Sequence, residues 1–205
     1  MEKTVQHELQ EHAEAEEKRI AFPGLLREAT PPQRQLDAKI DFSATSGPSG
    51  AWLECFQACR AKLGTGTLLA LVGTRGEGKT QIAVELIRAT CRDGRTAKYA
   101  RVAEYFMDIK ATFGKDGDRL TEREVVNLYC RPRLLVLDEA HEKAGSEWAG
   151  SLLNLLIDRR YADRKDTILV ANLKRDDFVT AIGPSIASRM NETGGIIECA
   201  WGSFR

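Results

Sequence analysis

One short stretch, GTRGEGKT at Gly73–Thr80, constrains the fold of this chain more than any other. It follows an apolar run from Thr67 to Gly73 and precedes a segment whose apolar residues recur at helical spacing. A buried strand, a glycine-rich turn and a helix N-terminus in this order turn backbone N–H groups toward a bound phosphate. An ordinary glycine turn with the same spacing by accident is the alternative. The context favours a phosphate-binding loop in an α/β fold.

The positions of the loop have distinct predicted roles. The glycines let the backbone wrap around the phosphates, Lys79 brings a charge to the outer phosphates, and the Thr80 hydroxyl is a predicted ligand of Mg²⁺. The nucleotide-binding residues predicted in this way are Gly73, Thr74, Arg75, Gly76, Glu77, Gly78, Lys79, Thr80 and Gln81.

Strand and helix patterns alternate along the rest of the chain. The predicted strands are apolar on both faces and span Thr67–Gly73, Thr96–Val102, Leu134–Glu139, Thr167–Asn172 and Gly195–Ala200. Such strands, separated by helices, predict a five-stranded parallel sheet covered on both sides. A chain of 205 residues has room for one such domain and an appendage.

The appendage is predicted at the N-terminus. Residues 1–20 are dominated by Glu, Gln, Lys and His, with few apolar residues at helical spacing. Such a segment is either a solvated arm or a helix that becomes ordered on a partner. Pro23-Gly24 is predicted to end it, and Pro31-Pro32 to keep the following chain extended. We therefore predict a partner-binding arm over residues 1–39 and the folded domain over residues 40–205.

Polar residues that end the later strands are candidates for catalysis. Asp138 follows an apolar strand and is predicted to hold Mg²⁺ through water, and Glu139 to act as the general base. Asn172 ends the next strand and is predicted to sense the γ-phosphate; a strand-ending Asn that starts a turn is the alternative. Arg189 is a candidate arginine finger in trans or a surface salt-bridge residue.

Composition excludes several classes of protein. The 30 basic and 30 acidic residues balance, so contact with nucleic acid requires a local patch. The five cysteines are odd in number and lack CxxC spacing, which favours reduced thiols. No stretch approaches the roughly 18 apolar residues of a membrane span, and no signal peptide is visible. These features predict a cytoplasmic protein.

The glycine loop, the Asp-Glu strand, the polar strand end and the late arginine, in this order, resemble the AAA+ ATPases. The tail SRMNETGGIIECAWGSFR and the early KRIAFPGLLREA resemble the DnaC-type helicase loaders of bacteria and phages. This resemblance implies an oligomeric ATPase of slow turnover that uses ATP and Mg²⁺. It also implies binding to single-stranded DNA and to a DnaB-type hexameric helicase, with Arg205 as a second arginine near the nucleotide.

The chain departs from the family pattern in two ways. Arg75 and Glu77 replace the Pro and Thr that are more usual in the loop. The separate C-terminal helical lid of most AAA+ proteins has no sequence left to form it.

The segment between the second and third strands, where the family carries its single-strand-binding insertion, is the candidate DNA contact. Lys110, Phe113 and Lys115 combine positive charge for phosphate with an aromatic ring for base stacking. Phe106 and Phe113 are seven residues apart, however, and fit a core-facing helix face equally well.

Other functions remain as alternatives. DEAH at Asp138–His141 also spells a helicase box, but such helicases need a second domain that 205 residues cannot contain. A small-molecule P-loop kinase fits the length, but such a kinase should have an arginine-rich lid and an acceptor pocket, whereas here the late arginine precedes a strand. An IstB-type helper of DNA transposition shares the AAA+ core and differs in its partner. A binding module that uses ATP as a switch with negligible turnover is the last alternative.

Overall fold

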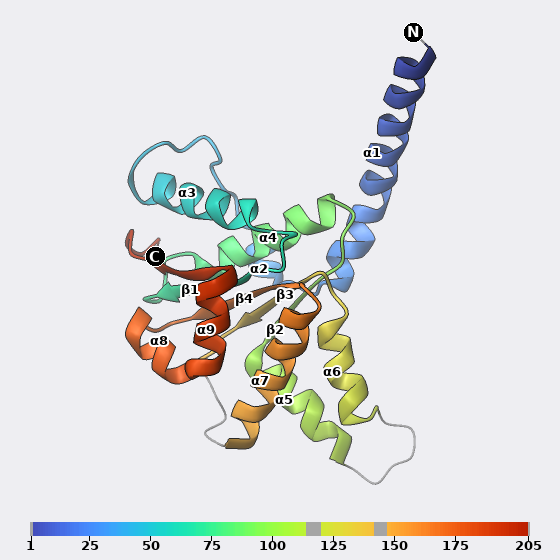
Figure 1. The fold of residues 1–205 in the computed structure, drawn as a ribbon. Helices are drawn as coiled ribbons and strands as arrows, with labels where there is room; N and C mark the ends of the chain where they lie inside the picture. The colour runs from blue at the N-terminus through green and yellow to red at the C-terminus, as the bar shows by residue number, and fades with distance from the viewer. Residues whose placement is uncertain (1, 114–119, 142–146, 205) are drawn as a thin grey trace.

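The computed structural model describes residues 2–113, 120–141 and 147–204. Within them, five strands form one parallel sheet with the order β2-β3-β4-β1-β5 (Figure 1). The strands are β1 (Leu68–Gly73), β2 (Ala97–Arg101), β3 (Leu134–Asp138), β4 (Asp166–Ala171) and β5 (Gly195–Cys199). The predicted five-stranded parallel sheet is confirmed, because every strand ends within one residue of its predicted range.

The register of the sheet brings the predicted site together. Strands β1, β3 and β4 are buried at every position, as expected for the interior of a parallel sheet. Arg101 of β2 pairs with Asp138 of β3, and Gly73 of β1 pairs with Cys199 of β5. Because all the strands run in one direction, these residues lie along one edge, where ligands bind in open α/β sheets.

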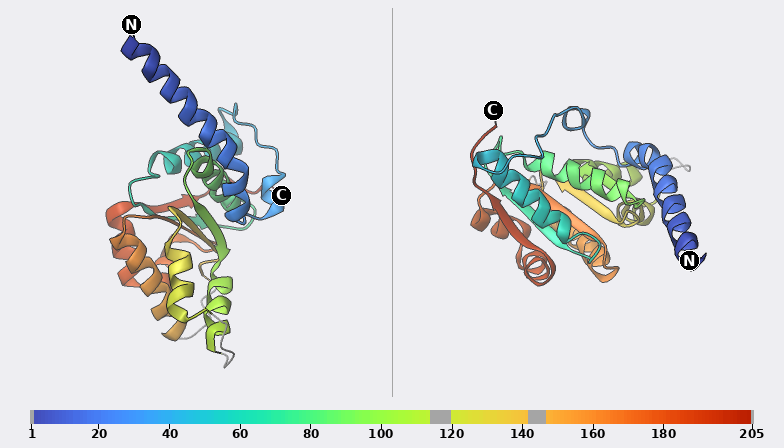
Figure 2. Two further views of the ribbon diagram at one scale, coloured as in Figure 1. Left: turned by 90° about the vertical axis from the view of Figure 1, so that its right-hand side faces the viewer. Right: turned by 90° about the horizontal axis from the view of Figure 1, so that it is seen from above.

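Helices cover both faces of the sheet (Figures 1 and 2). Helices α3 and α4 and the end of α1 pack on one face, and α5 to α9 pack on the other. The helices from α3 onward are α3 (Gly47–Ala61), α4 (Lys79–Arg92), α5 (Val102–Lys110), α6 (Glu122–Cys130), α7 (Glu147–Ala162), α8 (Arg175–Ile182) and α9 (Pro184–Thr193). The result is a three-layer α/β domain.

Helix α1 spans Glu2–Glu28 and runs through Pro23, so the prediction that Pro23-Gly24 ends this helix is wrong. Phe22, Leu25 and Leu26 pack against the core cluster around α4. This packing stabilises the helix across the proline, which removes only one N–H donor from the backbone ladder. The first half of α1 projects away from the body of the molecule (Figures 1 and 2).

The chain between α1 and α3 follows the surface of the domain. One helical turn, α2 (Gln33–Leu36), interrupts the stretch that was expected to be extended. Gln81 Nε2 on α4 donates to the Gln35 carbonyl at 2.9 Å, and an Arg88 N–H donates to the Leu36 carbonyl. These bonds fix residues 33–36 on α4. No helix of the described ranges has the length and apolar character needed to cross a membrane.

Candidate nucleotide site

The glycine-rich loop connects β1 to α4 in a conformation that requires its glycines. Gly73, Gly76 and Gly78 have φ values of 140°, 94° and 76°. These lie in the left-handed region that side chains disfavour. A Cβ atom added at Gly73 would come within 2.3 Å of Glu77 Oε2 and 2.5 Å of the Cys199 carbonyl oxygen. The loop therefore packs tightly against the end of β5.

Three consecutive carbonyls of the loop are bound by donors outside it. Trp52 Nε1 of α3 donates to Gly78 at 3.1 Å, and Trp201 Nε1 donates to Glu77 at 2.9 Å. The Phe204 backbone N–H donates to Gly76 at 3.0 Å. Donors on the outer side hold the loop in the arched form that directs its own N–H groups inward. These contacts were not predicted, although the aromatic residues of the tail were a signal for two of them.

A cavity of about 880 Å³ lies over the loop. Of the predicted nucleotide-binding residues, Arg75, Gly76, Gly78, Lys79, Thr80 and Gln81 line it. Gly73, Thr74 and Glu77 are not among its lining residues. The strand ends contribute Tyr99, Arg101, Asp138, Glu139 and Asn172. The structure thus brings the predicted loop and strand-end residues into one site.

The segment from Pro32 to Asp41 forms a further wall of this cavity. Arg34, Gln35 and Lys39 line it, and so do Phe204 and Trp52. The side chains of Arg34 and Lys39 add positive charge to a site that already contains Lys79. Sequence reasoning assigned residues 1–39 to an arm and did not expect any of them beside the loop.

Lys79 is buried at the base of the cavity, with 4% of its surface exposed. Its Nζ donates to the Gly73 carbonyl at 3.1 Å and to the Thr74 carbonyl, and it lies 3.7 Å from Glu77 Oε2. Burial lowers the pKa of Lys79, and the negative charge of Glu77 acts in the opposite direction.

Asp138 accepts hydrogen bonds from three elements. Thr80 Oγ1 donates to Oδ2 at 2.9 Å, Tyr99 OH donates to the same oxygen at 2.8 Å, and the Glu139 N–H donates to Oδ1 at 2.7 Å. Burial, helped by the charge of Asp138, raises the pKa of Tyr99, so this hydroxyl remains a neutral donor. Tyr99 was not predicted, because nothing in its strand pattern separates it from a core residue.

The donor set at Thr80 and Asp138 fits Mg²⁺. A hydroxyl oxygen and a carboxylate oxygen lie in hydrogen-bonding contact at the cavity wall, and Mg²⁺ prefers oxygen ligands with few from the protein. Among the described residues, no group of three or more His, Cys, Asp or Glu side chains is arranged to hold a metal. An ion bound here would therefore take its other ligands from phosphate and water.

Glu139 leaves the end of β3 with a positive φ of 55°, which is rare for a residue with a side chain. Its Oε2 lies 3.7 Å from Arg101 Nε at the end of β2. The charge of Glu139 raises the pKa of Arg101. Arg101 was not predicted, although its position at a strand end beside Asp138 was a usable signal. Its guanidinium holds the candidate general base at the cavity wall.

Asn172 follows β4 and lines the cavity, and its role as a sensor of the γ-phosphate stays a prediction. Its backbone N–H donates to His141 Nδ1 at 3.4 Å. His141, the last residue of the DEAH stretch, thus connects the ends of β3 and β4.

The comparison with protein families decides the affiliation of the chain. The model of the IstB-like ATP binding protein family matches residues 1–188. The chain belongs to this family. The predicted resemblance to DnaC-type AAA+ proteins is also confirmed, by relatives and by solved structures.

Two relatives of this IstB-like family member come from Escherichia coli strain K12. The uncharacterized protein YdaV is 30% identical over 142 residues, which are 68% of this chain and 55% of YdaV. The replicative helicase loader DnaC is 24% identical over 134 residues, which are 65% of this chain and 54% of DnaC. The chain spans about half the length of these curated relatives.

Solved structures place this IstB-like chain in the AAA+ fold. A crystal structure of the DnaC helicase loader matches with a TM-score of 0.67 and 21% identity, over 82% of this chain and 99% of the other. The AMPPCP-bound DnaA from Aquifex aeolicus matches with a TM-score of 0.63 and 19% identity, over 80% of this chain and 50% of DnaA.

Arg189 of this IstB-like protein lies on α9, away from the cavity lining. Its guanidinium lies 3.0 Å from Asp158 Oδ1, donates to the Ser185 carbonyl at 3.0 Å and covers the Tyr161 ring at 5.7 Å. Within one chain it therefore pairs with α7, and its predicted role toward a neighbouring subunit stays a prediction. Arg205 lies outside the described residues.

The candidate DNA contacts of the IstB-like chain divide between surface and core. Phe106 is buried, whereas Phe113 is 61% exposed, with its ring 6.0 Å from that of Trp148. Lys110 Nζ lies over the same Trp148 ring at 5.7 Å. Lys115 lies outside the described residues. The core-facing alternative thus holds for Phe106 but not for Phe113.

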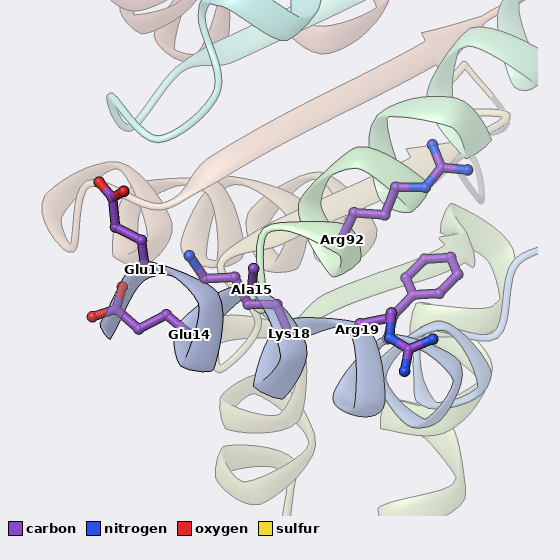
Figure 3. Close-up of a pocket in the computed structure, with 7 residues that line it drawn as sticks. Glu11, Glu14, Ala15, Lys18, Arg19 and Arg92 are labelled. Atoms are coloured by element: carbon purple, nitrogen blue, oxygen red, sulfur yellow. The ribbon is translucent and has the colours of Figure 1, made fainter. Parts of the chain in front are cut away.

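A second cavity, of about 580 Å³, lies between α1 and the end of α4 (Figure 3). Arg92 lies over the Phe22 ring at 5.5 Å, and both residues line this cavity. Glu11 and Glu14 lie toward one end and Arg19 toward the other (Figure 3). None of the predicted nucleotide-binding residues lines this cavity, so the candidate nucleotide site remains the one over the loop.

Proposed function

We propose that this chain is an ATPase that loads a DnaB-type replicative helicase onto single-stranded DNA. The observation that carries the proposal is the convergence of Lys79, Thr80, Asp138 and Glu139 on one cavity at the carboxyl edge of the sheet. The similarity to the replicative helicase loader DnaC supports the choice of process. ATP is the expected nucleotide because the family is described as ATP binding.

The residues around the cavity have complementary roles in this proposal. The loop N–H groups and Lys79 would bind the outer phosphates, and Thr80 directly and Asp138 through water would hold Mg²⁺. The bound ion supplies positive charge that offsets the charge on the phosphate oxygens. Glu139 accepts the proton of the attacking water, and Asn172 orients that water. Arg101 must give up part of its contact with Glu139 for this carboxylate to reach the water.

The partners are assigned to different parts of the molecule. The projecting half of α1 is the helicase-binding arm, since its described side chains are almost all exposed. Lys110 and Phe113, together with Lys115 outside the described residues, are the single-strand contacts. Arg189 would act on the nucleotide of a neighbouring subunit in an ATP-dependent oligomer, after exchanging Asp158 for phosphate.

Hydrolysis is tested by Glu139→Gln in the full chain. We expect the ATPase rate to fall by at least about 100-fold, because the general base is lost, with ATP affinity within about threefold of the parent. An unchanged rate would contradict the role of Glu139 and favour a chain that uses ATP only as a switch. Glu147→Gln, at the start of α7, is a matched control.

Helicase capture is tested by size-exclusion co-elution with the host's replicative helicase, with and without ATP and Mg²⁺. Removing residues 1–39 would also remove the contacts of Phe22, Leu25 and Leu26 with the core, so substitutions in the exposed half of α1 are preferable. Changing Glu11, Glu14 and Glu17 to Lys should abolish co-elution. The same reversal at the exposed Glu54, Asp176 and Asp177 is the control.

An IstB-type helper of DNA transposition is the second candidate, favoured by the family match over residues 1–188. Absence of a helicase complex for the unaltered chain would support it. ATP-dependent assembly on double-stranded DNA would then be the next measurement.

A further inference from the structure

Glu77 is a carboxylate enclosed within the phosphate loop itself. Its side chain is buried, with 5% of the residue's surface exposed. Oε1 accepts a hydrogen bond from Thr74 Oγ1 at 2.8 Å. Oε2 has no hydrogen-bond partner among the described residues and lies 3.7 Å from Lys79 Nζ. A buried charge with one unpartnered oxygen is costly to a fold, which suggests that this one has a function.

The carboxylate lies behind the loop rather than in the cavity. Lys79 lines the cavity, whereas Glu77 does not. Oε2 points into the space left by the missing side chain of Gly73, next to the Cys199 carbonyl. The ammonium group of Lys79 can therefore meet a negative group on either of two sides, the carboxylate behind it and a phosphate in front.

Two contacts hold Glu77 in this position. Trp201 Nε1 binds its backbone carbonyl at 2.9 Å, and the Thr74 hydroxyl binds its carboxylate. Movement of the carboxylate away from Lys79 would break the Thr74 bond and expose a packed site. The negative charge is thus fixed, and Lys79 has to weaken its contact with it when it reaches forward.

We propose that Glu77 is an internal counter-charge that competes with the outer phosphates of ATP for Lys79 and so lowers the affinity of the site. This inference rests on the proposed ATP binding and deepens it. Because charges interact strongly in a buried site, the effect on affinity should be large. Weak binding would favour exchange of nucleotide between cycles of partner binding, since most changes in affinity appear in the dissociation rate.

The competition should depend on the number of phosphates. Lys79 contacts the outer phosphates, so only ligands that reach it lose affinity through Glu77. ATP should be affected most, ADP less, and AMP not at all. A purely structural role of Glu77 in shaping the loop would instead change the binding of all ligands in the same direction.

The experiment uses isothermal titration calorimetry on the full chain with ATP, ADP and AMP in the presence of Mg²⁺. Glu77→Gln keeps an acceptor for Thr74 and removes the charge, and should tighten ATP binding by roughly tenfold. Glu77→Asp keeps the charge and should stay within about twofold of the parent. Glu198→Gln, which removes an exposed carboxylate of β5 that does not line the cavity, is the control and should change nothing.

Thermal melts establish that each variant is folded, and Glu77→Thr replaces the Gln variant if that one is not. If Glu77→Gln binds ATP more tightly than the unaltered protein and AMP binding is unchanged, the result supports the counter-charge. The same holds if only the Glu77→Gln variant binds ATP measurably. If the unaltered protein binds ATP and the Glu77→Gln variant binds it equally well or more weakly, the inference about Glu77 is overturned, but the proposed ATP site is not. Failure of both proteins to bind ATP overturns both.

Discussion

Lys79 and Arg160 are two buried cations at opposite edges of the same sheet. Arg160, fully buried on α7, binds the Thr167 hydroxyl and the carbonyls of Tyr129, Cys130, Pro132, Arg133 and Asp166 near the starts of β3 and β4. Lys79 binds two loop carbonyls and lies beside Glu77 at the opposite edge. Both charges are buried away from water. The Nε and both terminal nitrogens of Arg160 donate hydrogen bonds to fixed acceptors, whereas Lys79 Nζ donates to two carbonyls and has Glu77 only at 3.7 Å.

The difference separates a structural cation from a functional one. Burial lowers the pKa of Arg160 to about 10, so its guanidinium remains charged at neutral pH. Its planar donors match fixed carbonyls and join α7 to the chain before β3 and β4. Lys79 has a flexible stem and partners that a phosphate can replace. A cation whose partners are exchangeable can bind a ligand, whereas one with a complete set of partners stabilises the fold.

The largest expected effect is on stability, from Arg160→Met. Loss of the guanidinium leaves buried carbonyls without donors, and we expect the free energy of unfolding to fall by about 4 kcal/mol. Urea denaturation followed by circular dichroism measures this. Arg159→Met, which removes an adjacent arginine with one bond to Asn127, should cost less than about 1 kcal/mol. Equal costs for the two variants would break the comparison.

The second prediction concerns Lys79→Met, which should affect ATP binding more than stability. ATP affinity should fall by at least about 100-fold, because charge-assisted bonds to the phosphates are lost. The free energy of unfolding should fall by about 2 to 3 kcal/mol, less than for Arg160→Met, since two loop carbonyls lose a donor and the buried Glu77 carboxylate loses its neighbouring cation. Calorimetric titration with ATP, together with urea denaturation, measures both quantities. A loss of stability as large as that of Arg160→Met would mean that Lys79 is equally structural.

The smallest effect should come from Trp201→Phe. The loop carbonyls receive single bonds from separate elements, unlike the carbonyls that share Arg160, so one lost indole N–H should weaken ATP binding only about fivefold. Fluorescence titration with a labelled ATP analogue measures the change. Trp148→Phe, whose ring packs with Phe106 and Phe113 away from the loop, is the matched control. An unchanged affinity would show that the loop holds its shape without the tail.

Local sequence patterns predicted the strands and the main residues of the candidate nucleotide site. The other residues of the site and the extent of α1 depend on contacts between residues far apart in the sequence. The run before Gly73 and the Asp-Glu pair at 138–139 signal their roles within a few residues. Tyr99 has no such signal and Arg101 has only its position at a strand end, because the importance of both comes from the register that pairs β2 with β3. Pro23 was misread as the end of a helix because its neighbours Phe22 and Leu25 stabilise α1 only through the core they pack against.

By itself, the sequence determined a parallel α/β sheet with a phosphate loop at its carboxyl edge. Periodicity and glycine placement are local properties, and they limit the backbone to few conformations. Only the tertiary structure decided which groups surround Lys79. The carboxylate of Glu77 lies behind it because Gly73 leaves room, and Trp52 and Trp201 hold the loop from outside. Such partners are separated along the chain and meet only when the sheet and its helices have packed.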